Sequence, residues 1–166
     1  MSQYGIRDLG LLEARTDPVF QNIADLVQMM LHASFALVTV IDDDNERQVF
    51  KASRGPDGQP LKDLSTPLSF SLCNHVRLRG GTVVIRDLSL DRSFRDHPAQ
   101  RECGIKAYLG APLLGPANDP IGAVCAAETH PRVWSDRDKA AIENFAALAA
   151  QQVLLRASLQ TLKMIA

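Results

Sequence analysis

The residues best suited to chemistry in this chain are Cys73 and His75, which lie two positions apart in the sequence Leu72-Cys-Asn-His-Val76. A thiol near an imidazole can bind a soft metal ion or form an activated thiolate. The surrounding pattern predicts a short helix over 69–78, and residues two apart on a helix point about 200° away from each other. Cys73 is therefore expected to be a small buried side chain, and His75 a surface or edge residue.

Other potential metal ligands lack the spacing of a metal motif. His97, Cys103 and Asp87 are possible recruits to a site at Cys73, but no two of them are spaced as ligand pairs usually are. The acidic run 42–44 lacks the glycine and the terminal glutamate of a calcium loop, so it is interpreted as a turn. We expect no metal and no haem in this chain.

A polar segment after residue 86 carries a second group of candidates. Asp87, Asp91 and Asp96 could hydrogen-bond a ligand or order a cation, although aspartates near serine and proline more often cap turns and short helices. His97 precedes Pro98 and could contact a ligand or respond to pH. Capping and a solvated loop histidine are the favoured interpretations, and ligand contact by Asp87 and His97 stays open.

Composition limits the partners that this chain can have. Its 166 residues carry 18 basic and 19 acidic side chains, a formal net charge of −1, which disfavours nucleic-acid binding. The longest apolar run, 35–41, is far shorter than the ~20 residues that span a bilayer, and the polar start does not resemble a signal peptide. Three cysteines without paired spacing fit free thiols. We expect a cytoplasmic protein that binds no membrane.

Hydrophobic patterns predict helix, sheet, a mixed middle, sheet and helix. Asp17 and Pro18 form a helix start, followed by apolar residues at helical spacing as far as Leu31. Strands are predicted over 36–41, 47–53, 82–86, 105–114 and 121–128, with a loop over 54–67 and a helical turn within 99–103.

The last predicted helix begins at Ser135, which forms a capping box with Asp138. One stripe, containing Ile142, Phe145, Ala149 and Val153, suits packing on a sheet. A second stripe is heptad-like and contains Leu148, Gln152, Leu155, Leu159 and Leu162. Either the second stripe seeks a partner helix, or Leu159 and Leu162 pack on the first helix, and the sequence does not separate these alternatives.

The order of four segments resembles a known family. Ser71-Leu-Cys-Asn-His-Val76, Val83 to Phe94, Gly104 to Leu114 and Ile121 to Asp138 together resemble GAF domains of bacterial histidine kinases and cyclic-dinucleotide enzymes. The resemblance implies an α+β fold with a central antiparallel sheet of five or six strands. The terminal helices would cover one face, and a pocket helix with loops the other. It divides the chain into an extension or helix over 1–16, a sensor domain over 17–153, and a signalling or dimerisation helix over 154–166.

Motifs of several GAF subclasses are missing from this sequence. The Asn-Lys, Phe and Asp-Glu series of cyclic-nucleotide receptors is absent, and Cys103 is followed by Gly104 where a bilin-binding member commonly has histidine. The cysteines also do not match the set of GAF-type methionine sulfoxide reductases. The resemblance therefore implies neither a covalent chromophore nor an enzyme.

The resemblance further implies a mostly apolar ligand pocket with one phenol and two thiols. Residues expected to face it or to flank it are Phe70, Cys73, Val76, Asp87, Phe94, His97, Tyr108, Ala111 and Cys125. Ordinary core packing is the alternative for Phe70, Phe94 and Cys125. Tyr108 is the most informative of the set because a buried phenol needs a hydrogen-bond partner.

Three functions follow from these observations. The first is a regulatory sensor in bacterial signal transduction, in which an unidentified small molecule changes the final helix of a homodimer and an effector in the same or another chain responds. The second is a ligand-free dimerisation module. The third, ranked below both, is a thiol-based redox sensor or enzyme that uses Cys73, Cys103 or Cys125.

Overall fold

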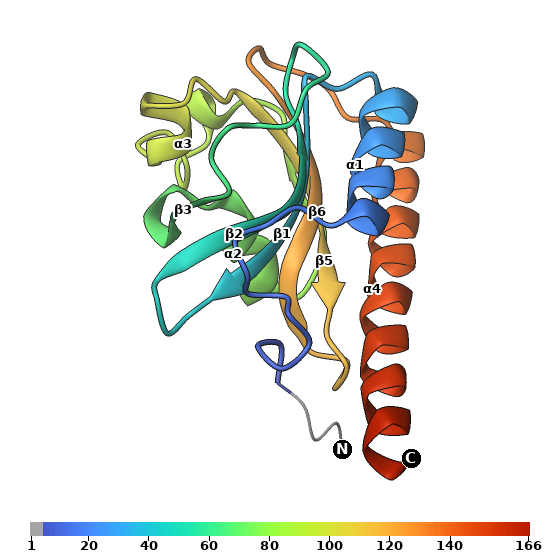
Figure 1. The fold of residues 1–166 in the computed structure, drawn as a ribbon. Helices are drawn as coiled ribbons and strands as arrows, with labels where there is room; N and C mark the ends of the chain where they lie inside the picture. The colour runs from blue at the N-terminus through green and yellow to red at the C-terminus, as the bar shows by residue number, and fades with distance from the viewer. Residues whose placement is uncertain (1–4) are drawn as a thin grey trace.

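The computed structural model describes residues 5–166. Their core is a six-stranded antiparallel sheet with strand order β3-β2-β1-β6-β5-β4. Figure 1 shows three layers, with α1 and α4 on one face of the sheet and α2 and α3 on the other. This is the α+β architecture, with six strands, that the sequence resemblance implied.

Helix α1 spans Pro18–Leu31 and begins where the sequence predicted. The Asp17 side chain accepts a hydrogen bond from the backbone N–H of Val19 at 3.1 Å, and Pro18 occupies the first turn, where no N–H is needed. The helix ends at His32, whose backbone is left-handed with φ of 51°. The preceding residues 5–16 form turns, and residues 1–4 of the predicted extension lie outside the described chain.

Strands β1 (Phe35–Asp42) and β2 (Arg47–Arg54) form the predicted hairpin. The loop predicted over 54–67 is wrong at its end, because Ser65–Pro67 forms a short edge strand, β3, paired with β2. Pro67 is tolerated there because an edge strand leaves half of its backbone groups unpaired in the sheet.

The middle of the chain contains four short elements and one helix of moderate length. The helix predicted over 69–78 is a 3₁₀ turn, η1 (Leu68–Phe70), followed by α2 (Leu72–Arg79). Ser71 divides them, since its hydroxyl accepts from the N–H of Asn74 and caps α2. The remaining elements are β4 (Val83–Ile85), η2 (Leu88–Leu90) and α3 (Pro98–Arg101).

The second predicted hairpin consists of β5 (Ala107–Leu114) and β6 (Pro120–Glu128). Strand β6 also pairs with β1, so it is central and covered on both faces, as its apolar sequence indicated. Gly122 is required by this pairing, because a Cβ there would lie 2.7 Å from the carbonyl carbon of Thr39.

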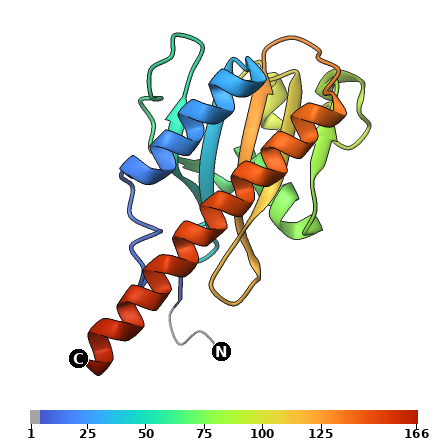
Figure 2. The same cartoon turned by 90° about the vertical axis from the view of Figure 1, so that its right-hand side faces the viewer.

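Helix α4 spans Asp136–Ile165, and both hydrogen bonds of the predicted Ser135–Asp138 capping box are present. Its sheet-facing stripe contains Ile142, Ala146, Ala149, Val153 and Ala157, so Phe145 is half-buried at the edge of that stripe. The helix continues well past the sheet (Figure 2).

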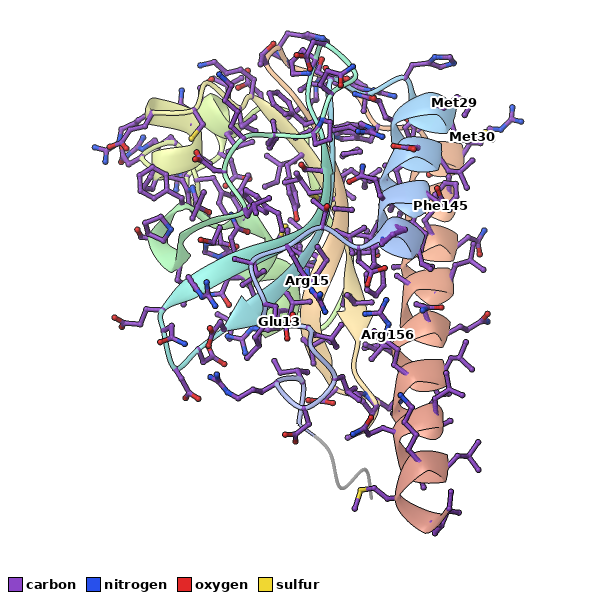
Figure 3. The ribbon with its side chains drawn as sticks, viewed as in Figure 1. Glu13, Arg15, Met29, Met30, Phe145 and Arg156 are labelled. Atoms are coloured by element: carbon purple, nitrogen blue, oxygen red, sulfur yellow. The ribbon has the colours of Figure 1, made fainter. Side chains whose placement is uncertain are left out.

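The heptad-like stripe of α4 is exposed in this chain. Leu155, Leu159 and Leu162 are 52, 49 and 57 % exposed, so Leu159 and Leu162 are not buried against α1, which was the alternative to a partner helix. The contact between α1 and α4 uses other residues. Arg156, on α4, is labelled in Figure 3. It pairs with the carboxylate of Asp17, and its guanidinium lies 4.9 Å from the ring centroid of Phe20.

Two apolar clusters lie on opposite sides of the sheet. The larger joins the sheet to α1 and α4 and includes Phe20, Leu109 and Ile142. The smaller joins the sheet to α2 and the 88–105 region and includes Cys73, Tyr108 and Cys125. No helix within residues 5–166 has the length and hydropathy needed to cross a membrane.

Candidate functional site

The smaller apolar cluster is hollow on the side that faces β1 and β2. A cavity of about 300 Å³ lies between the sheet, α2, α3 and the 61–66 segment. This volume is at the lower end of the range of small-molecule pockets. The lining residues are Phe35, Leu37, Gln48, Phe50, Leu61, Lys62, Asp63, Thr66, Phe70, Leu72, Cys73, Ala99, Cys103, Ile105, Tyr108, Cys125 and Ala127.

Strand alternation explains how the sheet contributes to this lining. Successive side chains of a strand point to opposite faces, so residues two apart share one face. Phe35 and Leu37 reach the cavity from β1, Gln48 and Phe50 from β2, and Cys125 and Ala127 from β6. The intervening residues of β1 and β6 pack on the other side, against α1 and α4.

Two thiols and a phenol form the wall of the cavity beneath α2. The Sγ atoms of Cys73 and Cys125 are 3.7 Å apart, and the hydroxyl of Tyr108 donates to Cys73 Sγ at 3.2 Å. Burial raises the pKa of Tyr108 well above its ordinary value, so the phenol keeps the proton that it donates. The predicted partner of this buried phenol is therefore supplied by the protein itself.

The two thiols differ in acidity although they touch. The hydrogen-bonding contact with Cys125 lowers the pKa of Cys73 against the opposing effect of burial. The same hydrogen bond raises the pKa of Cys125 well above its ordinary value, and burial adds to that shift. These opposite directions favour Cys73 over Cys125 as the more acidic thiol of the pair.

The polar atoms deep in the lining are paired within the protein. Gln48 donates to Thr66 Oγ1 at 2.7 Å and accepts from the hydroxyl of Ser71 at 2.7 Å. In the described part of the chain, no buried side-chain nitrogen or oxygen lacks a hydrogen-bond partner. The charged lining residues are Lys62 and Asp63, and both are exposed. The cavity thus presents an apolar interior with charge only at its solvent edge.

Four of the predicted pocket residues line this cavity, namely Phe70, Cys73, Tyr108 and Cys125. Val76 is fully buried and Phe94 half-buried in the cluster that surrounds the cavity, without reaching its surface. Asp87 is the N-cap of η2 and accepts hydrogen bonds from the N–H and hydroxyl of Ser89, which is the capping role favoured from sequence.

Ala111 was wrongly predicted to face the cavity. It is buried in the other cluster, against the helices, because Tyr108 and Gly110 face the cavity and Ala111 follows in the opposite orientation. Both faces of β5 are apolar, so the sequence pattern did not indicate which residues point to which side.

His97 lies in a second hollow, separate from the apolar cavity. It caps α3 by accepting from the N–H of Ala99, and its ring lies 5.4 Å from that of His75, centroid to centroid. Both residues line a more polar groove with Glu46, Ser71 and Asn74. Burial lowers the pKa of both imidazoles. Within residues 5–166, no three histidine, cysteine, aspartate or glutamate side chains lie close enough together to hold one metal ion.

The prediction that Cys73 and His75 diverge is confirmed. Cys73 is buried against the sheet, whereas His75 is exposed and packs on Phe94 and His97. No contact between the thiol and the imidazole is available for catalysis or metal binding.

Sequence reasoning missed the contribution of β1 and β2. Leu37, Gln48 and Phe50 were assigned only to strands, and Phe35 only to the apolar run before the first strand, although all four line the cavity. The available signal was the spacing of two, which places Gln48 and Phe50 on one face of the strand and Val49 on the other. It was obscured because β1 and β2 are buried on both faces.

Comparisons with known proteins agree with this architecture. The family model for the GAF domain matches residues 15–153. A cyclic di-GMP phosphodiesterase of Pseudomonas aeruginosa is 34 % identical over 150 residues, which cover 89 % of this chain and 24 % of that protein. A diguanylate cyclase of Escherichia coli is 24 % identical over 152 residues, covering 91 % of this chain and 44 % of that protein. The chain therefore spans less than half the length of either relative.

Solved structures show the same fold at low sequence identity. The GAF domain of a phosphoenolpyruvate-protein phosphotransferase from Coxiella burnetii superposes with a TM-score of 0.68 at 13 % identity, covering 93 % of this chain and 91 % of that one. Free methionine-R-sulfoxide reductase of Neisseria meningitidis gives 0.66 at 21 % identity, covering 94 % and 87 %. From the matched family model and the shared architecture, this chain belongs to the GAF domain family.

Proposed function

We propose that this chain is a sensory regulatory domain of bacterial signal transduction that binds an uncharged, largely apolar small molecule. The observation that carries the proposal is the cavity beside α2, whose interior is apolar and whose buried polar groups are already paired. Such a cavity gains free energy by burying apolar ligand surface. It offers no buried group that requires a polar ligand.

Charge limits the ligand class further. Among the lining residues only Lys62 and Asp63 are charged, and both are exposed at the edge of the cavity. A phosphate or carboxylate placed deep in the cavity would lose its hydration without gaining a cationic partner. We therefore propose that cyclic dinucleotides, named in the relatives' activities, are not the ligand of this cavity.

The sheet is the proposed route from cavity to output. Strand β6 presents Cys125 and Ala127 to the cavity, while Val124 and Ala126 on its other face pack in the cluster that includes α4. The start of α4 is also tied to β4, because Trp134 Nε1 donates to the carbonyl of Ile85 at 3.1 Å, and the Ile85 side chain packs in the smaller cluster. A ligand that binds two arrangements of the sheet unequally would shift the position of α4.

Output is proposed to pass through a homodimer formed by the terminal helices. Leu155, Leu159 and Leu162 are exposed at steps of four and three residues on the C-terminal half of α4. The end of this helix projects past the sheet (Figure 2). That spacing is typical of a helix that packs on a second helix. An effector in the same or another chain would respond, and the domain would act in the cytoplasm as a regulator without catalysis.

The ligand proposal is tested by thermal denaturation with a matched pair of probes, indole and indole-3-acetate. We expect indole to raise the melting temperature in a concentration-dependent way, because a ligand that binds only the folded state stabilises it. The carboxylate of indole-3-acetate should abolish most of that effect. Equal or stronger stabilisation by indole-3-acetate would contradict the proposed ligand class. Stabilisation by neither probe, with a persistent dimer, would favour the ligand-free dimerisation module.

A further inference from the structure

The two buried thiols of the cavity wall form a pair that the sensory proposal does not use. Cys73 comes from α2 and Cys125 from β6, 52 residues apart in sequence, and their sulfur atoms are 3.7 Å apart. Each residue is at most 2 % exposed, yet both line the cavity. A reagent small enough to enter the cavity would meet both sulfur atoms there.

Cys73 has the surroundings of a nucleophile. It is the second residue of α2, where the N-terminal end of a helix stabilises negative charge. Tyr108 donates a hydrogen bond to its sulfur at 3.2 Å, and Cys125 lies within S–H···S distance. These donors lower the pKa of Cys73 against the effect of burial.

Cys125 has the surroundings of a resolving thiol. Its hydrogen bond to Cys73 and its burial raise its pKa, so it stays protonated while Cys73 ionises. Its sulfur is already beside the atom that it would attack, so no large rearrangement is needed before a bond can form. The Tyr108 donor and the N-terminal end of α2, both located at Cys73, assign Cys73 as the attacking group and Cys125 as the resolving group.

We propose that Cys73 and Cys125 are a stoichiometric oxidation site for a small hydroperoxide that enters the cavity. The Cys73 thiolate attacks the terminal peroxide oxygen, an S–O bond forms as the O–O bond breaks, and the alkoxide leaves as an alcohol with the proton that Cys73 released. Cys125 then attacks the sulfenic sulfur, an S–S bond forms, and hydroxide leaves as water with the Cys125 proton. One hydroperoxide thus oxidises two thiols to a disulfide, and the hydroperoxide itself is reduced to an alcohol and water.

Oxidation would alter the cavity itself. A disulfide holds its sulfur atoms about 2.05 Å apart, so the present separation of 3.7 Å would shorten by about 1.6 Å. Because Cys73 lies on α2 and Cys125 on the central strand β6, that closure draws α2 toward the sheet. Both residues form the cavity wall, so the reduced and oxidised states would present different cavities to a ligand.

Cys103 supplies a natural comparison. It is exposed at the edge of the cavity that it helps to line, and partial burial of its thiol together with the charge of Glu102 raises its pKa. If exposure alone decided reactivity, Cys103 would be oxidised before the buried pair. The proposal predicts the opposite order.

The experiment uses the full chain, reduced and then freed of reductant, with cumene hydroperoxide as the probe. Remaining thiols are alkylated under denaturing conditions and located by peptide mass spectrometry. Wild type and Cys103→Ser should both lose two alkylation sites and gain a peptide that links Cys73 to Cys125. A wild-type protein that keeps both buried thiols while Cys103 is oxidised would overturn the proposal, as would a disulfide that contains Cys103.

Two further sets of variants test the assigned roles. In Cys125→Ser the first step should still occur, so dimedone should trap a sulfenic acid on Cys73, whereas Cys73→Ser should give no adduct on Cys125. Tyr108→Phe keeps the ring and removes the donor, so oxidation of the pair should slow by about tenfold, in line with loss of a hydrogen bond to a charged group. An unchanged rate, with circular dichroism confirming folded variants, would contradict the role given to Tyr108.

Discussion

The ring of Tyr108 lies over Gly110, its neighbour two residues along β5. A Cβ at position 110 would lie 2.7 Å from both Cε1 and Cζ of Tyr108, which is closer than real Cβ contacts come. The absence of a side chain at 110 therefore allows the phenol to lie along the sheet and to reach Cys73 with its hydroxyl. Gly110 also lies opposite Cys125 in the β5–β6 register. This one glycine sets the shape of the thiol-bearing wall.

Gly110→Ala is expected to push the Tyr108 ring away from the sheet. The cost in free energy of unfolding should be about 1–3 kcal/mol, which is typical of overpacking a closed core. Urea denaturation measures it. Gly81→Ala is the matched control, because a Cβ there would meet nothing within 4 Å. Equal stability of the two variants would contradict the packing described for Tyr108.

Arg132→Met is expected to destabilise the junction between the sheet and the two long helices. Arg132 pairs with the buried carboxylate of Glu128 at 3.0 Å and donates to the carbonyl of Leu31 at 2.6 Å. Removing the guanidinium leaves the buried carboxylate of Glu128 without its Arg132 partner, and such a loss typically costs about 3 kcal/mol in free energy of unfolding. Chemical denaturation measures the loss. Arg137→Met, at an exposed position in the first turn of α4, should change stability by less than about 0.5 kcal/mol.

Acidification should lower the free energy of unfolding of the protein through His75 and His97, which line the polar groove. Burial lowers the pKa of both imidazoles from the ordinary value of 6.5, and the charge of His75 lowers that of His97 further. The unfolded chain therefore binds more protons than the folded chain in the interval below pH 6.5. The free energy of unfolding should fall as pH drops through that interval and recover above it.

His97→Asn tests this pH dependence because asparagine can still cap α3 but cannot titrate. Urea midpoints at about pH 7.5 and about pH 5.5 should differ less for this variant than for wild type. His32→Asn carries the same substitution at the end of α1 and should leave the wild-type difference intact. A pH response that His97→Asn does not reduce would contradict the assignment.

Leu155→Glu and Leu159→Glu are expected to break the proposed homodimer. Both leucines are about half exposed on α4, so the folded monomer should lose little stability. A charge on a helix–helix seam is strongly unfavourable once the seam is desolvated. Light scattering after size exclusion should report a dimer for wild type and a monomer for the variants. Leu90→Glu, at 81 % exposure on η2, is the control and should remain dimeric.

Much of the fold could be predicted from local sequence. Asp17 with Pro18, and Ser135 with Asp138, indicated where α1 and α4 begin, because each cap is satisfied by residues within one turn. The edge strand Ser65–Pro67 could not be predicted in the same way, since its three residues are held by pairing with β2 and not by their own propensity.

The candidate site was predicted less completely. Phe70, Cys73, Tyr108 and Cys125, which the family resemblance grouped together, line one cavity, whereas Ala111 packs on the other side of the sheet. A strand buried on both faces has no polar residue to indicate its orientation. The contact between Cys73 and Cys125 depends on how α2 docks on β6, which no local pattern encodes.

The central claim is that the cavity beside α2 binds an uncharged apolar molecule. Isothermal titration of wild type with indole tests it most directly when it is paired with Ala127→Leu, which fills the cavity from β6, and with Ala140→Leu on the exposed side of α4. We predict saturable heat for wild type and Ala140→Leu, and at least about a tenfold weaker affinity for Ala127→Leu. Equal affinity in all three proteins, or saturable binding only to Ala127→Leu, would contradict the claim.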